Sequence, residues 1–246
     1  MGRYELIRLP DIKIKAGLFD VDDVLAMSES IHAQEAVIFF RKYGLDLTEE
    51  DHQHYYMTEH GGGTFGILHD YFAGRHGLCR QLINQSKDRI FVEQLIHLAE
   101  ENQGASGLLD HMSSKGLPLA YVTSNYRMST VRMLESLGMH RMIPVGVDHE
   151  YILDRGLKKK PHADPWIQGA KVLSEHYDIN VRAGDCIGIE DTDKGALSMK
   201  RAGVGYRVVL LPDFDDMARF SGEAQPDLFV ETLDTLIELD KELNLF

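Results

Sequence analysis

Cysteine and positive charge are both scarce in this sequence. The 246 residues include 2 cysteines, Cys79 and Cys186, which are too few for a disulfide framework. Lysine and arginine total 26 against 39 aspartates and glutamates, so the formal net charge is −13 at pH 7. Nucleic acids and anionic membranes attract a basic face, and this balance therefore argues against both as partners. Any anionic ligand would need local positive charge from a metal ion, a lysine or a helix N-terminus.

The sequence also has no long hydrophobic run. No apolar stretch is long enough to span a bilayer, and residues 1–15 carry charges throughout, unlike a signal peptide. We therefore expect a cytoplasmic protein. The composition, 43% hydrophobic and 26% charged, is typical of a globular chain with one sizeable core, or with a core and a smaller second domain.

The hydrophobic pattern divides the chain into two parts. From residue 28 to about 102, apolar residues recur at helical spacing, and no strand-like run stands out. Elsewhere, short unbroken apolar runs alternate with amphipathic segments, which predicts buried parallel strands covered by helices on both faces. We therefore expect an α/β fold: a doubly wound, Rossmann-like parallel sheet from residues 1–27 and 104–246, with an all-helical domain inserted at 28–103.

Polar side chains follow three of the predicted strands. They are Asp20, Asp22 and Asp23 after the first, Thr123, Ser124 and Asn125 after the second, and Glu190 and Asp191 after the third. Ligands of open parallel sheets bind beyond the carboxyl ends of the strands, so we expect these side chains to share one site. Taken singly, each acidic strand end could be an ordinary acidic turn. Three polar strand ends at one edge of the sheet favour a shared ligand site instead.

These residue types suit a cation and a phosphate group. Neighbouring carboxylates repel each other unless a cation sits among them, and ligation by oxygen alone suits Mg²⁺. The Thr123 hydroxyl and the backbone amides of a loop-to-helix junction can hold phosphate oxygens. A carboxylate can also attack phosphorus itself, which splits one difficult displacement into two easier steps.

Together, these residues resemble the four motifs of the haloacid-dehalogenase-like phosphohydrolases. The motifs are Asp20-Val21-Asp22, Thr123-Ser124-Asn125, Lys160-Pro161 and Glu190-Asp191, and their order and spacing fit over nearly the whole chain. The helical insertion is similar to the cap of the phosphoglucomutase-like subgroup. Two residues depart from the family's common pattern: Asp23 stands where glycine is usual, and Ala163 where proline is usual.

The resemblance implies hydrolysis of a phosphate ester through an aspartyl-phosphate intermediate. Asp20 would be the nucleophile, and Asp22 would be the general acid and base. Lys160 would supply a fixed positive charge, whereas we interpret Lys158 and Lys159 as solvated. The residues that would bind the phosphate group are Thr123, Ser124 and Asn125.

The resemblance also implies a Mg²⁺ site. Its ligands would be Asp20, the backbone carbonyl of Asp22, and Asp191. Glu190 would be either a further direct ligand or a neighbour of the ligands. A carboxylate and carbonyl set of this kind is typical of Mg²⁺, which keeps several waters and takes few protein ligands.

The helical insertion holds the candidate specificity residues. Gly62, Gly63 and Thr64 lie in a glycine-rich stretch where related caps place a loop that contacts substrate. A plain turn between helices is the alternative for this stretch. Arg75 and Arg80 are further candidates for contact with an anionic substrate, and a surface location is the alternative for both.

We therefore predict a Mg²⁺-dependent phosphatase for a small phosphorylated metabolite, with a sugar phosphate as one option. The alternative is a phosphoglucomutase-like phosphotransferase, whose cap would carry an arginine near Gly62–Thr64; none is there, although Arg75 or Arg80 could substitute. A phospho-accepting signalling domain uses similar residues, but its acidic pair precedes the acceptor. Neither the particular substrate nor the oligomeric state follows from the sequence.

Overall fold

The computed structural model describes residues 3–45, 48, 77 and 80–246. The chain forms two compact units. The core unit consists of Met1–Met27 and Glu100–Phe246, and the helical unit consists of Ser28–Ala99. None of the helices in the described ranges is long and apolar enough to cross a membrane.

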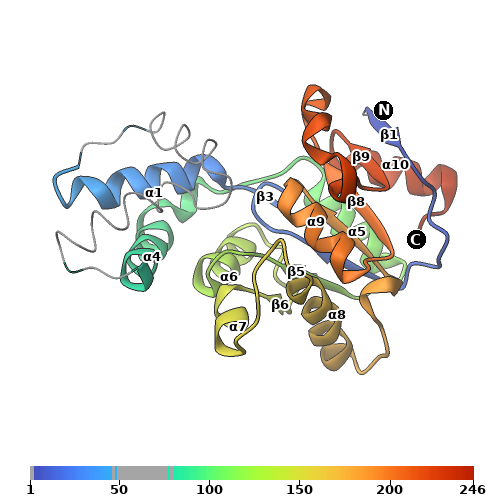
Figure 1. Ribbon diagram of the computed structural model, residues 1–246, viewed down its shortest axis with the longest axis horizontal. Coiled ribbons are helices and arrows are strands. Elements are labelled where there is room, and N and C mark those ends of the chain that lie inside the picture. The colour runs from blue at the N-terminus through green and yellow to red at the C-terminus, as the bar shows by residue number, and fades with distance from the viewer. Residues whose placement is uncertain (1–2, 46–47, 49–76, 78–79) are drawn as a thin grey trace. The chain divides into compact units, whose positions relative to one another are not determined.

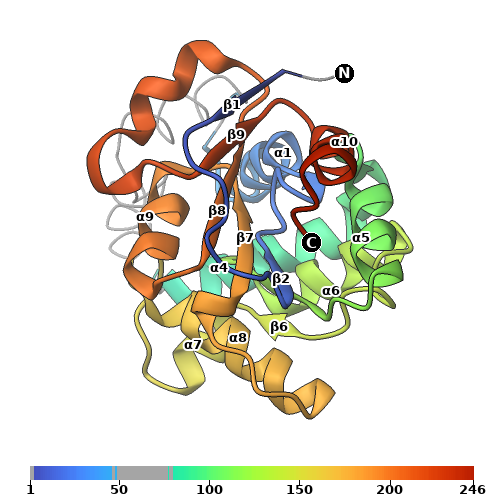
Figure 2. The same cartoon turned by 90° about the vertical axis from the view of Figure 1, so that its right-hand side faces the viewer.

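A seven-stranded sheet lies at the centre of the core unit, with the strand order β1-β9-β8-β7-β2-β5-β6 (Figure 2). All neighbouring pairs are parallel except β1 and β9. The strands are β1 (Tyr4–Leu6), β2 (Ala16–Phe19), β5 (Leu119–Val122), β6 (Gly146–Val147), β7 (Cys186–Glu190), β8 (Tyr206–Leu210) and β9 (Leu228–Val230). This sheet confirms the predicted α/β fold with a parallel, Rossmann-like core.

Helices cover both faces of the sheet (Figure 2). On one face α8 and α9 pack against each other and against the strands, and on the other face α5 packs against α10. The helices of the core unit are α5 (Ala105–Ser114), α6 (Arg127–Ser136), α7 (His149–Asp154), α8 (Asp164–Tyr177), α9 (Asp193–Ala202) and α10 (Leu233–Leu243). Short 3₁₀ segments, η3 (Ala183–Asp185), η4 (Phe214–Phe220) and η5 (Gly222–Ala224), complete the connections.

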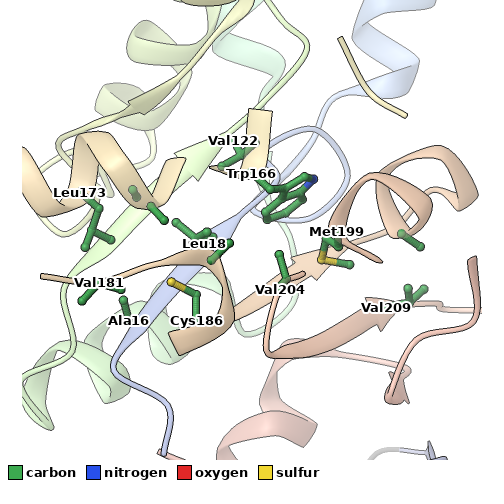
Figure 3. Packing of buried hydrophobic residues seen from close by; sticks show 14 of the residues in the cluster. Ala16, Leu18, Val122, Trp166, Leu173, Val181, Cys186, Met199, Val204 and Val209 are labelled. Carbon is green, nitrogen blue, oxygen red and sulfur yellow. The ribbon is translucent and has the colours of Figure 1, made fainter. Parts of the chain in front are cut away.

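The central strands are buried on both faces because their sequences are unbroken apolar runs. On the α8 side, Trp166 is fully buried and packs into a cluster with Leu18 and Met199 (Figure 3). On the α5 side, Gly17 lets the helix approach closely, since a Cβ there would lie 2.9 Å from the Met112 side chain. The central strands are therefore closely packed on both faces.

A two-stranded pair marks the point where the chain leaves and re-enters the core unit. β3 (Ala26–Met27) pairs antiparallel with β4 (Glu100–Glu101). Asn102 reinforces this junction, because its backbone N–H donates to Leu25 O at 3.1 Å and its side chain donates to Asp23 O at 2.7 Å. The loop that follows β2 is thereby tied to the chain that returns from the helical unit.

The helical unit contains α1 (Glu29–Arg41) and α4 (Arg80–Ile90), which pack side by side (Figure 1). A π-helical segment, η1 (Phe91–Leu95), and a 3₁₀ segment, η2 (Ile96–Leu98), follow α4. An ion pair joins the two main helices, with Lys87 Nζ 3.2 Å from Glu35 Oε1, and both side chains are buried. His32 also contacts Glu35 at 2.8 Å and stacks on Phe91.

Candidate active site

The carboxyl ends of β2, β5 and β7 lie side by side because these strands are neighbours in the sheet. The register aligns Phe19 with Ile189, and the backbone N–H of Asp20 donates to Ile189 O at 2.9 Å. Asp20, Thr123 and Glu190 therefore come to the same edge, as the sequence predicted from the strand ends.

Lys160 joins all three of these strand ends through one buried ammonium group. Its Nζ donates to Asp20 Oδ1 at 2.8 Å, to Glu190 Oε1 at 2.6 Å and to the Val122 carbonyl at 2.8 Å. An ammonium has three donors, and all three are used. Burial alone would lower the pKa of Lys160, but the two carboxylates outweigh it and raise that pKa above its usual value. The lysine is therefore a fixed positive charge.

Glu190 is engaged by protein donors at both of its oxygens. Oε1 accepts from Lys160, while Oε2 accepts from the Asp191 N–H at 3.0 Å and from the N–H and hydroxyl of Thr192 at 3.0 and 2.9 Å. A Cβ on Gly195 would lie 1.8 Å from Oε1, so glycine is needed there. Burial opposes ionisation of Glu190, but Lys160 and the hydrogen bonds lower its pKa below the usual value. Glu190 thus anchors the lysine and the turn into α9.

The carboxylates of Asp20, Glu190 and Asp191 form a cluster beside Lys160. Ligand oxygens of Asp20, Glu190 and Asp191 lie within 4.8 Å of one another. Burial raises the pKa of Asp20 well above its usual value, Lys160 opposes this, and Glu190 and Asp22 add to it. Burial and the neighbouring carboxylates also raise the pKa of Asp191.

One oxygen of this cluster is buried without a partner. Among the residues that the structure describes, no donor bonds to Asp191 Oδ1. A buried carboxylate oxygen without a donor is costly, and a cation at that point would satisfy it. The cluster of Asp20, Glu190 and Asp191 is therefore compatible with a divalent metal ion, for which oxygen donors are suited.

The Asp22 carboxylate lies against the loop that follows β5. Its Oδ2 accepts from Thr123 Oγ1 at 3.1 Å, and its Oδ1 accepts from Asn125 Nδ2 at 3.2 Å. The motifs after β2 and β5 are thus in direct contact, as the shared strand edge predicted.

Asp23 has a left-handed backbone conformation, with φ +52°. Its N–H donates to Ala26 O at 2.7 Å, which closes the tight turn between β2 and β3. Glycine adopts such a conformation without strain, and aspartate is among the few other residues that tolerate it. The turn geometry therefore explains why glycine is usual at this position in the motif, and why aspartate can replace it.

The loop of Thr123, Ser124 and Asn125, which we call the phosphate loop after the role predicted for it from the sequence, runs from β5 to the start of α6. Thr123 Oγ1 accepts from the Asn125 N–H at 3.0 Å, and Asn125 Oδ1 accepts from the Tyr126 N–H at 2.8 Å. Thr123 is buried, Asn125 is half-buried and Ser124 is exposed. These side-chain bonds stiffen a turn whose position, before the N-terminus of α6, suits an anion.

Two residues at this edge were not predicted from the sequence. His149 and Lys159 line a small pocket together with Thr123, Ser124 and Lys160. The run at residues 143–147 indicates the strand observed as β6, and His149 lies two residues after it, so the rule that located the other strand ends could also have located His149. Lys159 is exposed, as predicted, but it lies close enough to His149 to lower the pKa of the imidazole.

Most of the predicted specificity residues fall outside the described part of the chain. These are Gly62, Gly63, Thr64 and Arg75. Arg80 is the first residue of α4, and its side chain is also outside the description.

Comparison with known proteins agrees with this geometry. Residues 18–209 match the model of a family described as haloacid dehalogenase-like hydrolase. The chain is 26% identical over 210 residues to the protein CbbY of Rhodobacter capsulatus, covering 82% of this chain and 86% of that protein. It is 25% identical over 193 residues to the phosphorylated carbohydrates phosphatase of Thermotoga maritima, covering 78% and 82%.

The fold is also found in a solved structure. The crystal structure of CbbY from Rhodobacter sphaeroides in complex with phosphate superimposes with a TM-score of 0.70 and 22% identity, covering 91% of this chain and 96% of that chain. The family match extends over most of the chain and includes all the strand-end residues described above. The chain therefore belongs to the haloacid dehalogenase-like hydrolase family and is a phosphatase enzyme.

Proposed function

We propose that this protein is a Mg²⁺-dependent phosphatase that hydrolyses a small phosphorylated metabolite through an aspartyl-phosphate on Asp20. The observation that carries the proposal is the setting of the Asp20 carboxylate. Lys160 fixes its Oδ1 at 2.8 Å, while no donor within the described ranges bonds to its second oxygen. A carboxylate that is held in place with one oxygen free has the geometry of an attacking nucleophile.

In the first proposed step, a carboxylate oxygen of Asp20 attacks phosphorus. The bond between phosphorus and the ester oxygen breaks, and Asp22 transfers a proton to the departing alkoxide. The hydrogen bonds from Thr123 and Asn125 hold Asp22 in place for this transfer. The products of this step are the free alcohol and the aspartyl-phosphate.

In the second proposed step, Asp22 takes a proton from a water molecule, and the water oxygen attacks phosphorus. The bond to Asp20 breaks, which releases inorganic phosphate and restores the carboxylate. Lys160 and the amides of the phosphate loop balance the negative charge of the transferring group. Bound Mg²⁺ would be held by Asp20, the Asp22 carbonyl and Asp191, and would supply further positive charge. We assign Glu190 to the anchoring of Lys160.

The proposed substrate class is a phosphorylated sugar or a metabolite of similar size. The relative from Thermotoga maritima, named a phosphatase of phosphorylated carbohydrates, supports this choice. The division of the chain at residues 28–103, and the role of Gly62, Gly63 and Thr64 in specificity, stay predictions.

A phosphate-release screen tests the proposal. The full chain is incubated with a panel of sugar phosphates and other small phosphate monoesters, either in EDTA or with added Mg²⁺. We expect phosphate release that needs Mg²⁺ and that Ca²⁺ restores less well, because Ca²⁺ binds with looser geometry. Asp216→Asn, on an exposed segment, serves as a control with full activity. Release that persists in EDTA would contradict the metal requirement, and isomerised product without free phosphate would identify a phosphotransferase.

A further inference from the structure

The segment Asp148–Glu150, at the end of β6, holds the phosphate loop and the start of α6 from one side. Asp148 is buried and receives a bidentate contact from Arg127, with Nε 2.7 Å from Oδ2 and Nη2 3.1 Å from Oδ1. Its Oδ1 also accepts from the Tyr151 N–H at 2.7 Å and so caps α7. Glu150 Oε2 accepts from the Arg127 N–H at 2.8 Å. These contacts fix the segment relative to the first residue of α6.

His149, at the centre of this segment, contacts three consecutive residues at and just beyond the phosphate loop. Its backbone N–H donates to Asn125 O at 2.9 Å. Its ring lies beside the Ser124 backbone, close enough for that backbone to oppose the lowering of the His149 pKa, and both residues line the same small pocket. The ring also stacks on Tyr126, with 4.3 Å between centroids and an angle of 29° between planes. His149 itself is 7% exposed, so these contacts are shielded from solvent.

The surroundings keep the His149 ring uncharged. Burial and the nearby positive charge of Lys159 lower the pKa of His149 to about 4. A neutral imidazole has a single N–H donor. The Ser124 backbone lies within the influence of the ring, so that donor is available to the phosphate loop.

We propose that His149 is a positioning residue, which holds the backbone of Ser124 and Asn125 in the conformation that binds the phosphate group. It acts through the loop and does not itself touch the substrate. Because the loop is assigned to phosphate binding, this inference rests on the proposed function. Its distinguishing consequence is that loss of the ring donor weakens the binding of the phosphate group more than it slows the chemistry at Asp20.

Four substitutions of the full-length protein separate the ring donor from its packing. His149→Phe keeps an aromatic ring against Tyr126 but removes the donor. His149→Asn and His149→Gln place an amide donor near the Nδ1 or the Nε2 position. His176→Phe is the matched control, since His176 is exposed near the end of α8. If His149→Phe fails to fold, as judged by its melting curve, His149→Ala takes its place.

The measurements are KM and kcat for the best substrate and the dissociation constant of inorganic phosphate by calorimetry. For His149→Phe we expect KM and the phosphate dissociation constant to rise between about twofold and tenfold, the range for one net hydrogen bond. We expect kcat to fall less than KM rises, His176→Phe to match the wild type, and one amide variant to restore phosphate binding.

Two results would overturn the inference. One is a folded His149→Phe protein with unchanged KM and phosphate affinity, and the other is a drop in kcat alone. Failure of the proposed function is distinguishable, because the wild type would then release no phosphate from any substrate. In that case the calorimetric comparison of the variants with inorganic phosphate still decides the role of His149.

Discussion

Replacing Lys160 with methionine tests the electrostatic arrangement at the centre of the site. Methionine keeps most of the length of the stem and its packing near Trp166, whose ring centroid lies 5.0 Å from Nζ. The substitution removes the ammonium that both Asp20 and Glu190 contact. Two buried carboxylates would then lie close together without their shared counter-ion.

The expected loss of stability follows from the burial of these groups. The side chains of Lys160 and Glu190 are 7% and 1% exposed, so water does little to replace the missing partner. Removal of one member of a buried ion pair costs about 3–5 kcal/mol. Since domains of this kind have about 5–15 kcal/mol of stability, we expect Lys160→Met to fold but to unfold at much lower urea concentration. We also expect kcat/KM to fall by about 10²–10³.

The assay is urea unfolding at neutral pH, followed by tryptophan fluorescence. The chain has one tryptophan, Trp166, which is buried in the core unit, so the signal reports unfolding of that unit alone. Lys158→Met, at an exposed position in the same basic run, is the control, and we expect it to change stability by less than about 0.5 kcal/mol. Adding Glu190→Gln to Lys160→Met should recover about 1 kcal/mol or more, because it removes one unpaired charge. A loss below about 1 kcal/mol for Lys160→Met, with no recovery in the double variant, would refute the reasoning.

Three further substitutions test other parts of the structure. Burial would raise the pKa of Asp240, but hydrogen bonds from Lys115 and His111 lower it below 3.8. The ionised Asp240 carboxylate therefore stabilises the folded protein above pH 3.8, and this stabilisation is lost as the pH falls through the lowered pKa of the folded state. Asp240→Asn should cost about 2 kcal/mol at pH 7 and little at about pH 2, and an equal cost at both would contradict this assignment. Asp23→Ala should destabilise the core unit by about 1 kcal/mol in urea unfolding while Asp23→Gly does not, because of the positive φ; equal stabilities would count against strain at this turn. Mg²⁺ should raise the melting temperature of the wild type but not of Asp191→Asn, and a full shift in the variant would remove Asp191 from the metal site.

The sequence predicts the fold and the location of the site because both follow from short-range patterns. The apolar runs that became β2, β5 and β7 are unbroken, and each is followed at once by polar residues. Parallel strands in one sheet align their carboxyl ends, so this pattern is enough to bring Asp20, Thr123 and Glu190 together.

The remaining details depend on contacts between residues that are distant in the sequence. The β3–β4 pair has two residues in each strand, too few to give a periodic signal. Glu190 could not be recognised as the anchor of Lys160 until the distance between them was known. Likewise, the sequence around Asp148 and His149 does not show that Asp148 pairs with Arg127 or that the His149 N–H donates to Asn125 O, because both contacts are more than 20 residues away in the chain. Asp23 was an unexplained departure from the motif until its left-handed backbone was observed.

Trapping the covalent intermediate tests the central claim, that Asp20 is the nucleophile, most directly. Asp22→Asn is mixed with Mg²⁺ and a phenyl phosphate whose leaving group needs no proton, then quenched in acid and analysed by peptide mass spectrometry. Without the Asp22 base the second step slows, so the account predicts one phosphoryl group on the peptide that contains Asp20, and none when Asp20→Asn is added. A phosphoryl group on another residue, or phosphate release by Asp20→Asn at the wild-type rate, would contradict it.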